Sequence, residues 1–236
     1  LENDSVRVAE TSTLHYAVRL ARPGHIRVFL KLKAGNLLAA LPGKHTPDIL
    51  QLISDVYPGM EAAQSVLQTS LQNANPVIHP AVTLANAARI EGTGGDFLFY
   101  EEGVSDSTGR LIEALDRERI AIGAKLGLTI FPDPHMGMRQ GYMLKNNYGA
   151  AYREAPGFLG IGAQPQLDHR YLNEDVGYGL VFMSGLAKQV DVATPSMDAV
   201  IQLTSVLMNR DYAGEALRTP GTLGIAGYSG AELGAL

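Results

Sequence analysis

The stretch N-A-N-P-V-I-H-P-A-V, residues 73–82, places a histidine between two prolines in a segment that otherwise has a helical pattern. Asn75 and His79 are four residues apart, so on a helix their side chains share a face. Each proline removes a backbone N–H, so we expect the helix to bend and to expose carbonyl groups beside the imidazole. Because the pKa of histidine is about 6.5, this imidazole suits proton transfer at neutral pH.

The residues alone leave two interpretations of this stretch open. In the first, the bent helix lines a cleft, and Asn75 and His79 face a substrate together. In the second, Asn75 caps a new helix that starts at Pro76, and His79 only fills space in the core.

A second group of polar residues lies in D-H-R-Y-L-N-E-D-V, residues 168–176, after a long loop rich in glycine and proline. An arginine such as Arg170 can bind a substrate carboxylate through two parallel hydrogen bonds. A carboxylate such as Asp175 can orient a histidine. The alternative is an acidic helix start with a surface pair between Arg170 and Glu174, which would contribute little to stability.

Composition excludes several classes of protein. The chain has 236 residues, 46% of them hydrophobic and 18% charged, with a net charge of −5, as in globular proteins. It has no basic run for nucleic acid and no apolar run long enough for a membrane span. With no cysteine it has no disulfide and no thiolate metal site, and we assign no metal ligands. We expect a cytoplasmic protein without nucleic-acid or membrane partners.

The pattern of apolar residues changes along the chain. Residues 5–41 alternate and contain two turn signals, which predicts a short antiparallel meander. From residue 46 the period becomes helical, and Thr46 and Pro47 are typical of a helix start. Residues 60–91 read as one long helix, and Thr194 with Pro195 predicts the start of another.

This order predicts a mostly α-helical fold with a short β meander. Strands precede helices without β-α-β alternation, which indicates two units, residues 1–45 and residues 46–236. Because a three-stranded meander is hardly stable alone, we expect it to be the end of a larger sheet.

The sequence resembles the opine dehydrogenases, a family that includes octopine, nopaline and N-(1-carboxyethyl)norvaline dehydrogenases. The similar segments cover nearly the whole chain in consistent order, namely residues 9–42, 69–91, 114–128 and 169–203. The resemblance implies an α-helical substrate domain, preceded by the last strands of a Rossmann-type NAD(P)-binding domain. It also implies an oxidoreductase that joins the amino group of an amino acid to an α-keto acid and reduces the resulting imine with NADH or NADPH.

The resemblance also implies roles for individual residues. It gives catalytic roles to His79 and Asp175, which form a pair, and makes Arg170 the residue that binds a substrate carboxylate. It places Asn73 and Asn75 along the substrate cleft.

Cofactor binding is where the sequence departs from the family. Thr11 falls where the family's chain passes the nicotinamide. No G-x-G-x-x-G turn for the cofactor pyrophosphate occurs in the 236 residues. We therefore expect a missing N-terminal NAD-binding segment, and we expect the 236-residue chain to be inactive by itself. The oligomeric state, a homodimer included, is left open.

Two other functions compete with this interpretation. One is another two-domain NAD(P)-dependent dehydrogenase, which acts on a 2-keto or 3-hydroxy acid without an amine. The other is a non-catalytic helical module. The identities of the amino acid and the keto acid are not predicted.

Overall fold

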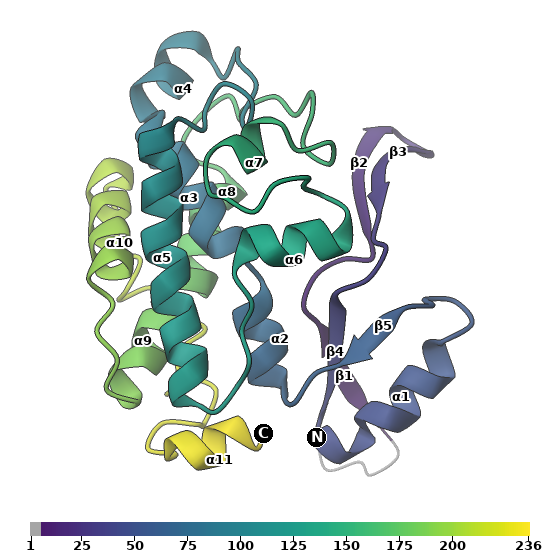
Figure 1. Cartoon of the computed structure of the whole chain (residues 1–236). Coiled ribbons are helices and arrows are strands. Elements are labelled where there is room, and N and C mark those ends of the chain that lie inside the picture. The colour runs from purple at the N-terminus through teal and green to yellow at the C-terminus, as the bar shows by residue number, and fades with distance from the viewer. Residues whose placement is uncertain (1–5) are drawn as a thin grey trace.

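The computed structural model describes residues 6–236, in which a small sheet stands beside a larger helical body (Figure 1). Strand β1 (Val8–Thr11) pairs antiparallel with β4 (Asn36–Leu41), and β4 pairs parallel with β5 (Met60–Ala62). The central strand β4 is buried over most of its length. Helix α1 (Thr46–Ile53) and helix α2 (Val66–Gln72) both pack against it, which explains why its sequence is apolar on both faces.

Strands β2 (Tyr16–Arg22) and β3 (His25–Lys31) form a separate antiparallel hairpin. Gly24 in its turn has φ +77°, a conformation that glycine adopts without strain. The predicted strands are thus present, but they do not form one meander. Because β1 pairs with β4 across the whole hairpin, β2 and β3 project from the sheet as an insertion and approach the helical body.

The helical body is built from the remaining elements. After α3 (Asn75–Ala85) and α4 (Ala87–Thr93) comes the long helix α5 (Asp106–Lys125). The later elements are α6 (Asp133–Gln140), α7 (Ala150–Arg153), α8 (Arg170–Asn173), the π-helical turn η2 (Asp175–Leu180), α9 (Val181–Gln189), α10 (Pro195–Met208) and α11 (Gly230–Gly234). A short 3₁₀ turn, η1 (Gly43–His45), precedes α1. The predicted start of α10, with Thr194 as N-cap and Pro195 first, is confirmed.

Helix α3 lies at the centre of this body. It packs against α5, α8, α10 and η2, and every residue from Pro76 to Thr83 is buried. A helix buried on all sides must be apolar almost throughout. A histidine at its centre therefore needs hydrogen-bond partners for both ring nitrogens.

The prediction of one long helix over residues 60–91 is wrong. Strand β5 occupies its start, and the helical part is divided among α2, α3 and α4. Asn73 has an extended backbone, and its Oδ1 accepts a hydrogen bond of 3.1 Å from the N–H of Asn75. The chain turns there, so Pro76 falls in the first turn of α3, where a missing N–H costs nothing. Only Pro80 interrupts the helix.

A fully buried ion pair fixes the ends of α2 and α6. Arg119 on α5 donates to Asp116 Oδ1 at 2.7 Å, to the carbonyl of Leu71, and at 2.9 Å to the carbonyl of Phe131. Asp116 Oδ2 accepts the N–H of Asp133 at 2.9 Å. Through these bonds α5 positions the two segments that border the cleft described below.

Within residues 6–236, none of the helices combines the length and the apolar character that crossing a membrane requires.

Candidate active site

The side chains of His79 and Asp175 meet although 96 residues separate them in sequence. Nδ1 of His79, on α3, lies 2.7 Å from Oδ2 of Asp175, the first residue of η2. Both side chains are buried, and a carboxylate accepts hydrogen bonds only, so Nδ1 carries the proton and donates. This contact fixes the tautomer and leaves Nε2 with the lone pair that a base requires.

The second ring nitrogen of His79 is also paired. The hydroxyl of Tyr100 lies 3.0 Å from Nε2 and donates to it when Nδ1–H faces Asp175. Tyr100 follows α4 in an apolar segment, and burial raises the pKa of its phenol well above the ordinary value. The phenol therefore stays neutral and can donate or accept at neutral pH.

Aromatic contacts hold the imidazole from the side. The ring of Tyr171 stacks on His79 with 3.9 Å between centroids and 21° between planes. The guanidinium of Arg170 lies 5.1 Å from the centroid of the same Tyr171 ring. Its distance to Glu174 is 4.0 Å, and both of these side chains are largely exposed, so the surface pair considered above is weak.

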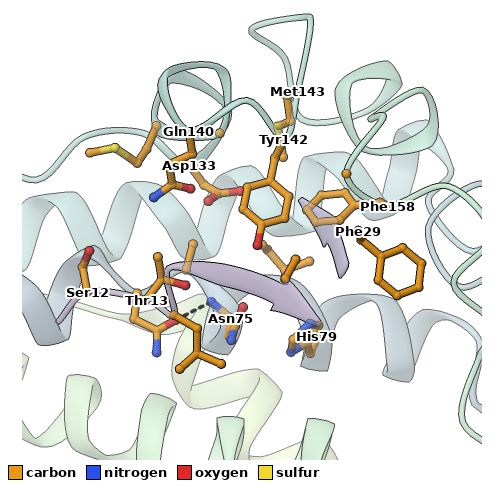
Figure 2. Close-up of a pocket in the computed structure, with 18 of the residues that line it drawn as sticks. Ser12, Thr13, Phe29, Asn75, His79, Asp133, Gln140, Tyr142, Met143 and Phe158 are labelled. Atoms are coloured by element: carbon orange, nitrogen blue, oxygen red, sulfur yellow. Dashed lines mark hydrogen bonds between the residues drawn. The ribbon is translucent and has the colours of Figure 1, made fainter. Parts of the chain in front are cut away.

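These groups open onto a cleft of about 360 Å³ (Figure 2). Of the residues selected from sequence, five line it: Thr11, Asn73, Asn75, His79 and Arg170. Asp175 is not among the lining residues and touches His79 from behind. In Figure 2, Asn75 and His79 lie on one side of the cleft, facing Asp133, Gln140 and Tyr142. The structure thus brings all six sequence-selected residues to one place.

The π-helical turn η2 determines how closely Asp175 approaches α3. Turns of this kind are frequent at functional sites. A Cβ atom on Gly179 would lie 2.5 Å from Cγ of Pro76, so only glycine lets η2 lie against the rigid proline ring. The same packing sets the separation of Asp175 and His79.

We expect Gly179→Ala to destabilise the protein by about 1–3 kcal/mol, because the new methyl group overpacks this contact. The measurement is the free energy of unfolding in urea. Gly177→Ala is a matched control in the same turn, since its Cβ would meet Tyr212 at an ordinary 3.5 Å. Equal effects of the two substitutions would contradict a specific close approach at Gly179.

Comparison with known proteins identifies the family of this chain. A family model described as "NAD/NADP octopine/nopaline dehydrogenase, alpha-helical domain" matches residues 62–208. The chain belongs to the octopine/nopaline dehydrogenase family. An opine dehydrogenase from Arthrobacter sp. (strain 1C) is 39% identical over 97% of this chain and 63% of its own length. The protein ocs from Agrobacterium tumefaciens (strain Ach5) is 34% identical over 60% of this chain and 39% of its own.

Solved structures support the fold of this octopine/nopaline dehydrogenase family member. A structure of octopine dehydrogenase with NADH and L-arginine has a TM-score of 0.72 at 18% identity, covering 93% of this chain and 63% of that one. Yersinopine dehydrogenase has a TM-score of 0.67 at 14% identity, covering 92% and 62%. The chain thus spans less than two thirds of these relatives' lengths. The predicted fold class, a helical opine dehydrogenase domain with a few strands, is confirmed.

Three cleft residues of this family member were missed from the sequence. Tyr100 could have been suspected, because a buried tyrosine in an apolar segment needs a partner for its hydroxyl. Asp133 begins α6 and Tyr142 lies just after the end of this helix, and neither carries a comparable signal in the sequence. Burial, reinforced by nearby Asp116, raises the pKa of Asp133 to about 6, while Tyr152 donates to its Oδ2 at 2.6 Å.

Proposed function

We propose that the protein is an NAD(P)H-dependent opine dehydrogenase, which condenses an α-keto acid with the amino group of an amino acid and reduces the imine. The observation that carries this proposal is the His79–Asp175 pair at a cleft that Arg170 also lines. Membership of the octopine/nopaline dehydrogenase family supports it.

In the proposed reaction His79 transfers the protons. The amine adds to the keto carbon, and the carbinolamine then loses its hydroxyl as water, which requires a proton at that oxygen. Nε2 of His79 takes a proton that the nitrogen loses and passes it to this oxygen, and the transfer runs the other way in the reverse direction. Asp175 stabilises the imidazolium that carries it. Tyr100, bound to the same nitrogen, keeps Nε2 directed along the cleft until a substrate replaces its hydrogen bond.

Arg170 binds the carboxylate of the keto acid in this proposal. Its guanidinium lies beside the Tyr171 ring on which His79 stacks, and a bidentate contact would fix the keto carbon near Nε2. Orientation of this kind supplies much of an enzyme's rate.

We expect Arg170→Lys to raise the KM for the keto acid by about tenfold or more, because a lysine keeps the charge but loses the two parallel hydrogen bonds. The measurement is the KM for the keto acid and for the cofactor in the full-length gene product. Arg117→Lys, on the exposed side of α5, is the control. Equal increases in both KM values would mark Arg170 as a structural residue.

The residues that line the cleft are suited to bind one end of a nicotinamide cofactor. When bound, it supplies the hydride that reduces the imine. Thr11, Ser12 and Thr13 line the same cleft as His79, and we assign them to the nicotinamide end. The 236 residues contain no glycine-rich turn for the pyrophosphate, so we propose that this end is held outside them.

The sheet also supports a separation between a cofactor-binding part and a catalytic part of the protein. Strand β1 is largely exposed, and in the part of the chain that the structure describes its outer edge has no strand partner. Such edges are usually covered. We propose that β1 to β4, within residues 1–45, complete a dinucleotide-binding sheet and that residues 46–236 form the catalytic unit. Strand β5 lies beyond this boundary and still pairs with β4.

The test is oxidation of NADH or NADPH by the full-length gene product, with pyruvate and a panel of amino acids. The proposal predicts oxidation that depends on the amino acid. Oxidation at the same rate with pyruvate alone would favour a simple keto-acid dehydrogenase instead.

A further inference from the structure

A second arginine lines the cleft from the opposite end of the sequence. Arg19, on β2 of the hairpin, borders the same cleft as His79 and Arg170. Arg19 and Arg170 also border a neighbouring pocket of about 390 Å³, so both lie where the two spaces adjoin. The hairpin thus contributes a cation to a site otherwise built from helices.

The charge of Arg19 is not neutralised by a neighbour. Within residues 6–236, no carboxylate oxygen lies within 4.0 Å of it, and its hydrogen bond goes to the carbonyl of Val18 at 3.1 Å. By contrast, Arg89, Arg139 and Arg210 each lie within 2.9 Å of a glutamate oxygen. An arginine that borders a cleft and has no carboxylate partner of its own is available for an anionic ligand.

The hairpin formed by β2 and β3 is positively charged, although the protein as a whole is acidic. Residues 16–31 contain three arginines and one lysine and no acidic residue, whereas the chain as a whole has a net charge of −5. Arg19 lies directly opposite Arg27 in the strand register, a like-charge pairing that destabilises a hairpin. A site that attracts anions into the cleft explains why this arrangement is tolerated.

The charge of Arg19 affects the pKa of two tyrosines that line the cleft. Burial raises the pKa of the Tyr100 and Tyr142 phenols, and the positive charge of Arg19 opposes this rise at both. The hydroxyl of Tyr100 contacts Nε2 of His79. The charge of Arg19 therefore affects a phenol that is in direct contact with the histidine proposed to transfer protons.

We propose that Arg19 is a second carboxylate-binding residue, which holds one carboxylate of the joined substrates while Arg170 holds the other. This inference depends on the proposed function, in which an amino acid and a keto acid bring two carboxylates into one cleft. A single guanidinium can form two parallel hydrogen bonds with only one carboxylate at a time. Arg19, which has no carboxylate partner among residues 6–236, and Arg170, which has only a weak pair at 4.0 Å, match the two anionic groups of an opine, which lie on either side of its secondary amine.

The experiment uses the full-length gene product and iminodiacetate, the smallest molecule with two carboxylates across a secondary amine. N-Methylglycine, which has one carboxylate, is the reference ligand, and binding is followed by NMR titration. We expect the protein to bind iminodiacetate more tightly than N-methylglycine. Arg19→Ala should weaken iminodiacetate binding by about tenfold to a hundredfold, the range for a lost charged hydrogen bond. The preference for two carboxylates should then disappear.

Two further variants separate this inference from the proposed function. Arg22→Ala, on the same strand but outside both pockets, should leave iminodiacetate binding unchanged. If Arg170→Ala weakens binding and Arg19→Ala changes it by less than twofold, the role of Arg19 is overturned and the proposed function stands. If the unmodified protein does not distinguish the two ligands, the site with two carboxylates is itself overturned.

Kinetics of the full-length gene product separate a carboxylate from a cofactor phosphate. Arg19→Ala should raise the KM of the keto acid or of the amino acid and leave the KM of NAD(P)H unchanged. A rise confined to NAD(P)H would overturn the inference, because Arg19 would then bind the cofactor.

Discussion

Replacing His79 with alanine should lower the turnover number of the full-length gene product by about 10²–10⁴-fold, the usual contribution of a positioned acid–base group. Both ring nitrogens of His79 are hydrogen-bonded, and Asp175 holds the proton on Nδ1. In the proposed reaction, alanine removes the proton donor while leaving Arg170 and the cleft in place. The measurement is the steady-state rate of amino-acid-dependent NAD(P)H oxidation.

The control is His135→Ala, because His135 is exposed on α6 and stacks only on Phe131. It should keep nearly full turnover. His79 is buried, so the unfolding midpoint of each variant is measured beside its rate, and His79→Gln provides a variant of similar size. A loss below threefold in a folded His79 variant would remove this residue from the chemistry.

Replacing Arg119 with methionine should reduce the free energy of unfolding by about 3–5 kcal/mol, because it leaves Asp116 as an uncompensated buried charge. The substitution also removes the donors to the carbonyls of Leu71 and Phe131. Total stabilities are about 5–15 kcal/mol, so this loss would approach unfolding. Urea denaturation of the 236-residue chain gives the measurement.

Arg117→Met is the matched control two residues earlier on α5. Arg117 is exposed and paired with Glu113, so its loss should cost about 0–1 kcal/mol. The double variant Asp116→Asn/Arg119→Met should recover part of the loss, since no charge then stays buried alone. If Arg119→Met and Arg117→Met have equal effects, the buried pair does not hold the ends of α2 and α6.

The residues selected from the sequence lie together in the structure, whereas the elements around them were predicted less well. Local signals suffice for a helix start such as Thr194–Pro195, because a cap and a proline act on neighbouring residues. The pairing of His79 with Asp175 came from the family resemblance, since spacing alone left His79 open to a structural interpretation. The structure adds the contact and its second partner, Tyr100, whose selection depends on packing between distant segments.

The sequence predictions that were wrong also have causes outside the local sequence. The prediction of one long helix over residues 60–91 fails where Asn73 turns the chain and where β5 pairs with β4. Parallel pairing of three residues with a strand more than twenty positions earlier leaves no periodic signal. The hairpin was recognised as strands, but its position beside the cleft follows from the pairing of β1 with β4. Arg19 could not be selected without that position.

The most direct test of the proposed reaction is the mass of the product formed from pyruvate, an amino acid and NAD(P)H by the full-length gene product. We expect a secondary amine, in which the two acids are joined with loss of water and gain of two hydrogens. His79→Ala should slow the formation of this compound. Lactate as the sole product, with the amino acid unchanged, would contradict the proposed reaction.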